Sequence, residues 1–234
     1  MYHSITIGDK NTWDDWHLIP ATRPLFNPPS VKTNMVDIPG GDGSLDLTTV
    51  LAGRPTYNNR TGSFTFYVAN GYQDWAELYS DIMTYLQGQK LKAILEDDPD
   101  YYYEGRFWVN NWKSDKDWST ITMNYEVGPF KKSIVAEGDD WLWDTFNFET
   151  DMIQSFENLP VNGSLSITIE GDEISFPPTI ITSAPNMTVT FGDVTYSLNR
   201  GVNYIVELVL HAGDNTLIFS GVGTVTIKYE RGRL

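Results

Sequence analysis

The stretch PGGDGSLDLTTVLAGRPTYNNRTGSFTF, residues Pro39–Phe66, decides how the first half of this 234-residue chain folds. It places a Gly/Asp turn, an Asp-led segment and an Arg-Pro turn before a run of aromatic and β-branched residues. Glycine and proline interrupt regular structure, and β-branched and aromatic residues favour strands, so the stretch indicates antiparallel β-structure. It contains none of the side-chain chemistry that an enzyme needs.

The segments around this stretch predict a curled antiparallel sheet that carries one helix. Alternating apolar and polar residues predict strands, and they occur at His3–Ile7, Trp16–Ile19, Val31–Ile38 and Ser63–Val68. A helix is predicted at 74–87, because Asp74 and Glu77 have capping-box spacing and Gly88 stands at the C-cap position. Its apolar residues share one stripe, which predicts packing against a sheet; they are Trp75, Leu78, Tyr79, Ile82 and Leu86.

Two longer strands follow the helix. Leu91–Leu95 leads into the acidic loop EDDPD, and Tyr101–Trp112 with Trp118–Val127 predicts a hairpin. The first half is therefore α+β, and we expect a first domain at 1–130.

The composition changes in the segment Gly128–Asp140, which is polar and contains glycine and proline, and this predicts a linker at 131–140. Beyond it, short apolar segments alternate with turn residues, as is typical of an antiparallel β-sandwich. They are Leu165/Ile167/Ile169, Met187/Val189/Phe191, Val194/Tyr196/Leu198, Val202–Leu210, Leu217–Phe219 and Val225/Ile227/Tyr229. We expect a second domain at 141–234 and a mainly β chain overall.

Charge and composition narrow the functional classes. The net charge is −15 and there is no cysteine. A general grip on phosphate backbones needs clustered Lys and Arg, so nucleic-acid binding is not expected. Disulfides and thiolate chemistry are excluded. No apolar run approaches the roughly 20 residues that span a bilayer, and the start lacks a secretory pattern. We therefore expect a protein that folds in the cytosol and has no membrane segment.

Catalytic, cofactor and metal motifs are not found. Histidine occurs only at His3, His17 and His211, without the spacing of a metal pair or a catalytic triad. No phosphate-binding glycine motif is present. Four acids could together hold Ca²⁺, although their spacing differs from that of an EF-hand and a turn is the better prediction; they are Asp97, Asp98, Asp100 and Glu104.

Aromatic residues make up 14% of the chain. Such residues fill cores and protein interfaces, but exposed ones can also stack on sugars, so both interpretations stay open. The run Trp141–Phe148 lies beside the predicted linker, which favours a seam between domains or subunits. The candidate seam residues are Trp141, Trp143, Phe146 and Phe148.

The order of these parts resembles the distal tail proteins of long-tailed bacteriophages and tail-like particles. The matching segments are Gly40–Leu47, Leu51–Tyr57, Arg60–Phe66, the helix that starts near Asp74, and Leu142–Asp151. The resemblance covers about residues 1–150 by motif and the rest by architecture. It implies a ring-forming first domain and a galectin-like second domain.

The resemblance also implies a function and partners. We expect a hexameric ring that joins the tail tube to the host-adsorption apparatus and leaves a channel for the tape-measure protein and DNA. Its partners would be the tail tube protein, the tape-measure protein, the tail-tip hub protein, and a receptor-binding protein or cell-wall glycan. It would belong to the virion tail after assembly in the bacterial cytoplasm. We expect acidic side chains at the lumen and rim of the ring, and aromatic ones at its interfaces.

Arginine and aromatic residues favour interfaces. The candidates for subunit contact are Arg54, Tyr57, Arg60, Phe64 and Phe66. The alternative from another class is a carbohydrate-binding protein that uses its second domain to bind a cell-wall polysaccharide. A glycoside hydrolase has no positional support, because sequence spacing does not place two carboxylates across a cleft.

Overall fold

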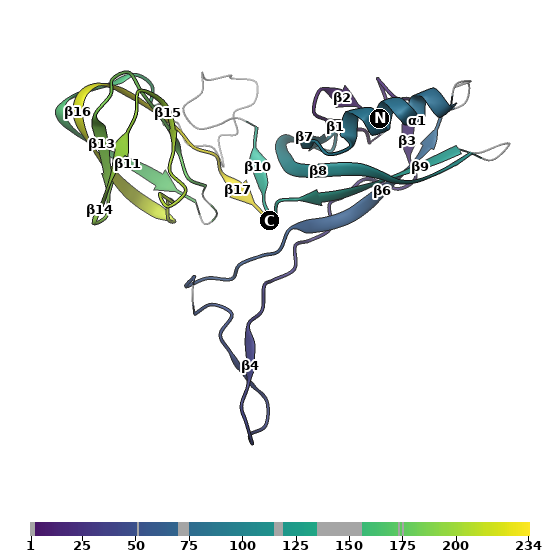
Figure 1. Ribbon diagram of the computed structural model, residues 1–234, viewed down its shortest axis with the longest axis horizontal. Helices are drawn as coiled ribbons and strands as arrows, with labels where there is room; N and C mark the ends of the chain where they lie inside the picture. Colours follow the sequence, from purple (N-terminus) through teal and green to yellow (C-terminus); the bar gives the residue numbers. More distant parts are fainter. Residues whose placement is uncertain are drawn as a thin grey trace. The chain divides into compact units, whose positions relative to one another are not determined.

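The chain divides into two compact units, each of which is described by itself (Figure 1). The computed structural model describes residues 3–50, 52–69, 75–114, 119–134, 156–172, 174 and 176–234. The first unit comprises Met1–Lys131 with Leu234, and the second comprises Lys132–Arg233. The described residues form strands and one helix, which confirms the mainly β fold.

The first unit contains an antiparallel sheet in the order β2-β1-β7-β8-β9-β6-β3. Every pairing along this order is antiparallel. The strands are β1 (Ile5–Ile7), β2 (Lys10–Asn11), β3 (Leu18–Pro20), β6 (Arg60–Val68), β7 (Lys90–Leu95), β8 (Asp98–Ser114) and β9 (Ser119–Val127). A separate two-stranded hairpin consists of β4 (Met35–Asp37) and β5 (Ser44–Asp46).

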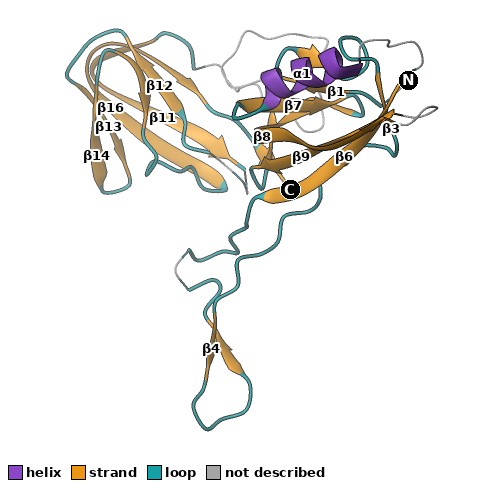
Figure 2. Cartoon of the chain, turned by 45° about the vertical axis from the view of Figure 1, so that its right-hand side comes forward, coloured by secondary structure: helices purple, strands orange, loops and turns teal. Residues whose placement is uncertain are grey.

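The helix α1 (Trp75–Leu86) lies across one face of this sheet (Figure 2). Its buried residues Leu78, Ile82 and Leu86 follow the predicted stripe, so the predicted packing is confirmed. Gly88 has a positive φ of 79°, which suits it to the C-terminal cap. The proposed capping residue Asp74 lies outside the described residues.

The predicted hairpin of β8 and β9 is confirmed, with a bulge between Val109 and Asn111. The alternating apolar residues of β9 face the core, as predicted, and are buried; they are Ile121, Met123, Tyr125 and Val127. Beside them lies an aromatic cluster centred on Phe26, whose ring is 5.2 Å from that of Phe64 and 4.8 Å from that of Tyr125. The core of the first unit therefore lies between this sheet and α1.

The second unit contains a six-stranded antiparallel sheet in the order β14-β13-β16-β12-β15, with β11 paired to β16. The strands are β11 (Leu159–Gly171), β12 (Thr179–Thr182), β13 (Met187–Phe191), β14 (Val194–Leu198), β15 (Gly201–Tyr204) and β16 (Gly213–Lys228). Two short strands, β10 (Lys131–Ser133) and β17 (Gly232–Arg233), pair with each other. Part of the predicted linker is thus a strand, and 135–140 lie outside the described residues.

Two predictions for the second unit are wrong. The strand expected at Val202–Leu210 is only β15, which ends at Tyr204. Leu217–Phe219 and Val225/Ile227/Tyr229 were expected to be two strands, but the single strand β16 contains Leu217–Phe219 and continues through Val225 and Ile227 to Lys228. The glycine between them bends the strand instead of ending it: Gly221 has a φ of 132° and its α-carbon faces the side chain of Met187. One side of β16 pairs with β11 throughout, and the other pairs with β13 and then with β12.

Two turns of the second unit are built in the same way. In Asn199–Asn203, the Asn203 amide accepts a hydrogen bond from the Asn199 backbone N–H at 2.8 Å and donates to the Asn199 carbonyl at 2.8 Å and the Gly201 carbonyl at 3.0 Å. In His211–Asn215, the Asn215 amide accepts from the His211 N–H at 2.7 Å and donates to the His211 carbonyl at 2.6 Å and the Gly213 carbonyl at 2.7 Å. Each asparagine therefore closes a five-residue turn around a glycine.

Candidate assembly interface

The most conspicuous surface of the first unit is a long excursion between β3 and β6, residues 27–59, which we call the arm. No described residue of the arm is buried. Its hairpin carries exposed apolar side chains; they are Met35, Val36, Ile38 and Leu45, with Val31 and Val50 nearby. Val36 and Leu45 stand directly opposite each other, with exposed fractions of 45% and 53%. An exposed apolar hairpin is typical of a surface that another chain covers.

The backbone of the arm is ordered by its own hydrogen bonds. Near the sheet, the Lys32 N–H donates to the Thr56 carbonyl at 2.8 Å and the Asn58 N–H donates to the Ser30 carbonyl at 2.9 Å. Farther out, β4 pairs with β5 (Figures 1 and 2). The Asp46 carboxylate accepts the hydroxyl and backbone N–H of Thr48, which lowers the pKa of Asp46. The arm is therefore a defined hairpin whose side chains lack a core.

The charge of the arm is one-sided. Between Thr33 and Gly53 there are three acids, Asp37, Asp42 and Asp46, and no Lys or Arg. Lys32 and Arg54 flank this segment on the side of the sheet. An acidic hairpin of this kind is suited to a surface that offers positive charge.

Arg60 holds the two strands of the arm where they leave the sheet. Its Nε donates to the Pro129 carbonyl at 2.8 Å and its Nη1 donates to the Asn27 carbonyl at 3.0 Å. The guanidinium lies 5.3 Å from the centre of the Tyr103 ring. Burial lowers the pKa of Arg60, since charge is costly away from water. Asn27 is the first residue of the arm and Arg60 directly follows its last residue, so this contact fixes the root of the arm.

The structure separates the predicted contact residues into two groups. Arg54 is exposed on the arm, Tyr57 is half-buried with its ring 5.7 Å from that of Phe130, and Arg60 is buried at the root. Phe64 and Phe66 lie in the core of the first unit, where they pack against its other buried side chains. The candidate seam residues Trp141, Trp143, Phe146 and Phe148 lie outside the described residues.

Sequence reasoning missed the apolar residues of the hairpin as surface residues. Val31–Ile38 was predicted as a strand, and its alternation is compatible with a half-buried position. The available signal was the acidic, glycine-rich Gly40–Leu47 segment, which is poorly suited to a core.

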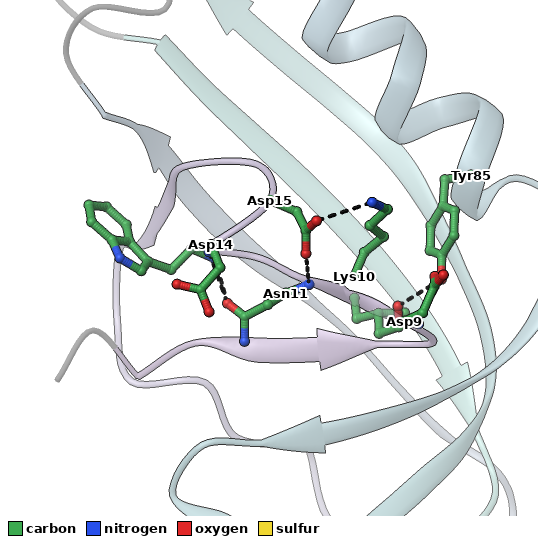
Figure 3. Close-up of polar contacts among 8 residues, drawn as sticks. Asp9, Lys10, Asn11, Asp14, Asp15 and Tyr85 are labelled. Atoms are coloured by element: carbon green, nitrogen blue, oxygen red, sulfur yellow. Dashed lines mark hydrogen bonds and ion pairs between the residues drawn. The ribbon is translucent and has the colours of Figure 1, made fainter.

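A second surface feature of the first unit is a hollow of about 610 Å³, lined by α1, by Lys10 of β2 and by Asp15 and Trp16, which follow β2. In Figure 3, the Asp15 carboxylate accepts the Asn11 backbone N–H at 2.7 Å and the Lys10 ammonium at 3.1 Å. These contacts lower the pKa of Asp15, the backbone bond having the larger effect. The Tyr85 hydroxyl accepts the Asp9 N–H at 2.9 Å, and burial raises its pKa. These polar groups close a turn, which accounts for their arrangement.

The acidic segment 97–104 is held by basic side chains of the protein. The Asp97 carboxylate contacts His3 and Arg23, both at 2.8 Å. Asp98 pairs with Lys131 at 2.6 Å, and Glu104 pairs with Lys90 at 3.1 Å. Within the described ranges, no three His, Asp or Glu side chains gather as a metal site would require. No helix in the described part of the chain is long and apolar enough to cross a membrane.

Neither the known family models nor the curated proteins include a match to this chain. Among solved structures, the chain is similar to Dit (gp 19.1) of SPP1, a paradigm of the hub adsorption apparatus in phages that infect Gram-positive bacteria. The TM-score is 0.60, the identity is 13%, and the match covers 100% of both chains.

The fold is that of a distal tail protein. The resemblance predicted from residues 1–150 is thus confirmed as a shared fold, and it extends over the second unit, where the sequence offered only architecture.

Proposed function

We propose that this chain is a structural hub protein of a phage tail tip or baseplate. Copies of it form a ring of six that joins the tail tube to the host-adsorption apparatus and leaves a channel for the tape-measure protein and DNA. The chain works through surfaces and without catalysis, a cofactor or a metal. The full-length match to the distal tail fold supports this role.

The arm is the observation that carries the proposal. A hairpin with its own backbone order, apolar side chains in water and no core behind it is stable only marginally by itself. A neighbouring copy can cover these side chains and pair with the free edges of the hairpin. A contact between different surfaces of identical copies repeats around an axis, and it gives a finite ring when the rotation closes.

Charge sets a condition on this assembly. Six copies would carry about −90, because each has a net charge of −15. Their mutual repulsion is screened by salt, with a Debye length of about 8 Å at physiological ionic strength. Ring formation should therefore be favoured by salt, and purification at low ionic strength would favour single chains.

Light scattering coupled to size-exclusion chromatography, followed by electron microscopy, tests the proposal. We expect a species of about 159 kDa, six times the 26.5 kDa chain, that shows rings with a central opening. The measurement should be made at low and at moderate salt and over a wide range of concentration. A chain that stays monomeric under all of these conditions would contradict the proposal.

A second candidate function, binding of a cell-wall polysaccharide, is favoured by one surface of the second unit. Four adjacent strands place hydroxyl side chains in register across one face, with Ser197, Thr188, Ser220 and Ser164 in a row. The next row contains Thr195, Thr190 and Ser166 around Ile218. Hydroxyl groups both donate and accept hydrogen bonds, as neutral sugars do. Glycan-array binding that is lost in Thr190→Ala would support this function, and no binding to any glycan would dismiss it.

A further inference from the structure

Among the described residues, Arg60 is a buried cation that has no acid beside it. Five Lys or Arg residues pair with carboxylates and remain at least partly exposed; the pairs are Lys10–Asp15, Arg23–Asp97, Lys90–Glu104, Lys131–Asp98 and Lys132–Glu230. Arg60 is only 5% exposed, and no carboxylate among the described residues contacts it. The most buried of these cations is therefore the one without a counter-charge.

The hydrogen bonds of Arg60 leave one nitrogen of its guanidinium, Nη2, unused. Nε and Nη1 donate to the carbonyls of Pro129 and Asn27, whereas Nη2 is inaccessible to water and has no acceptor in the part of the chain that the structure describes. A guanidinium has five N–H donors, and a buried donor without an acceptor is costly and rare in folded proteins. A buried charge without a partner is costlier still. Nη2 thus lacks an acceptor, and the guanidinium as a whole lacks an anion.

The position of Arg60 shows where such an anion could come from. Arg60 lies at the root of the arm, which the proposed ring brings against another copy. Of the three acids on the hairpin, Asp46 is engaged by Thr48, whereas Asp37 and Asp42 are exposed and contact none of the described residues. The arm therefore carries two carboxylates without partners, and the root carries a cation without one.

We propose that Arg60 receives a carboxylate of the arm of a second copy, Asp37 or Asp42, when copies associate. The proposal rests on the proposed function and names the contact that would link one arm to the next root. Because Nη2 is covered in the single chain, the root must shift for the carboxylate to enter. The rings of Tyr57, near the end of the arm, and Phe130, in the loop after β9, form a half-buried contact beside this root.

The first test compares Arg60→Met with Arg200→Met, an exposed arginine of the second unit, as the control. Arg60→Met removes a buried unpaired charge but also its hydrogen bonds to the Pro129 and Asn27 carbonyls, so the melting temperature of the single chain is measured beside association. The concentration at which copies associate should rise at least about tenfold, the value of one charge-assisted hydrogen bond. Arg200→Met should change neither quantity.

Asp37→Asn and Asp42→Asn identify the donor of the carboxylate. One of them should weaken association as much as Arg60→Met does, and combining it with Arg60→Met should add nothing further, as expected for two residues in one contact. If folded Arg60→Met associates like the unmodified chain, the proposal is overturned. If Arg60→Met only lowers the melting temperature and the folded fraction still associates normally, Arg60 is a structural residue and the proposal is equally overturned.

A second measurement does not depend on ring formation or on the folding of a variant. The probe is a synthetic peptide of residues 33–50, titrated into the unmodified chain while the NMR signal of the Arg60 Nε–H is followed. A shift that is absent with a peptide carrying Asn in place of Asp37 and Asp42 supports the proposal, even if the chain proves monomeric and the ring is abandoned. An unmoved signal at saturating peptide overturns the proposal and leaves the ring untouched.

Discussion

The buried amide of Asn215 should contribute more to stability than any other polar side chain of the second unit, and Asn203 provides its natural control. Both amides close five-residue turns with the same bonding pattern. They differ in burial, because Asn215 is only 3% exposed whereas Asn203 is half-buried. The comparison therefore isolates the effect of burial at constant hydrogen-bond geometry.

The magnitude follows from the bonds that Asn215→Ala removes. Three short hydrogen bonds at about 1 kcal/mol each give a loss of about 3 kcal/mol in the free energy of unfolding. In Asn203→Ala, water can replace the lost partners, so we expect about 1 kcal/mol. For a unit of about 100 residues, 3 kcal/mol corresponds to a fall of about 12–24 °C in the melting temperature.

Differential scanning calorimetry checks this prediction, since the two units can give separate transitions and only the transition of the second unit should move. Urea unfolding followed by far-UV circular dichroism provides the free energy independently. Equal losses for the two variants would refute the reasoning, as would a loss below about 1 kcal/mol for Asn215→Ala. Either result would mean that the backbone of the turn holds its shape without the amide.

Three further predictions concern the first unit. The double variant Val36→Ser with Leu45→Ser should change the unfolding free energy of the single chain by less than about 0.5 kcal/mol, because both side chains are exposed. The same variant should weaken association about tenfold in light scattering. Unaltered association would contradict the role of the arm. The pKa of Asp15 is lowered by a backbone N–H and a lysine, so its contribution is present above the ordinary value of 3.8 and is lost as the pH falls through the lower folded-state pKa. Acid unfolding of Asp15→Asn should lack this part of the pH dependence, and identical acid transitions would refute it. In urea unfolding, Gly8→Ala should lower the free energy of unfolding by at least about 2 kcal/mol more than Gly53→Ala does. Both glycines have a φ of 66°, but only at Gly8 would the added Cβ lie 2.2 Å from a tyrosine hydroxyl. Equal losses of free energy for the two variants would contradict this reasoning.

Periodicity predicted the parts of the fold that depend on burial. The stripe of α1 and the alternation of β9 were both located from the sequence, because each repeats over several residues and faces a core. Short strands without such repeats were missed, as β12 shows: its four residues TIIT carry two buried positions, too few to establish a period. The glycines of β16 predicted a break between two strands, but in the structure they bend one continuous strand.

The candidate interface was only partly predictable, for a different physical reason. Composition favoured arginine and aromatic residues as contact residues, but it cannot tell a core aromatic from a surface one. Phe64 and Phe66 sit on β6 with the same alternation as any core strand, and they are buried. Arg60 was named because arginine favours interfaces, whereas the folded chain shows that it is buried without an anion beside it.

The path of β16 has a consequence for the order in which the protein is made. This strand pairs with β11, β12 and β13, all of which precede it in the sequence. A ribosome therefore releases those three partners before the strand that joins them exists. The sheet of the second unit must wait for β16, and its earlier apolar strands are exposed to chaperones in the interval.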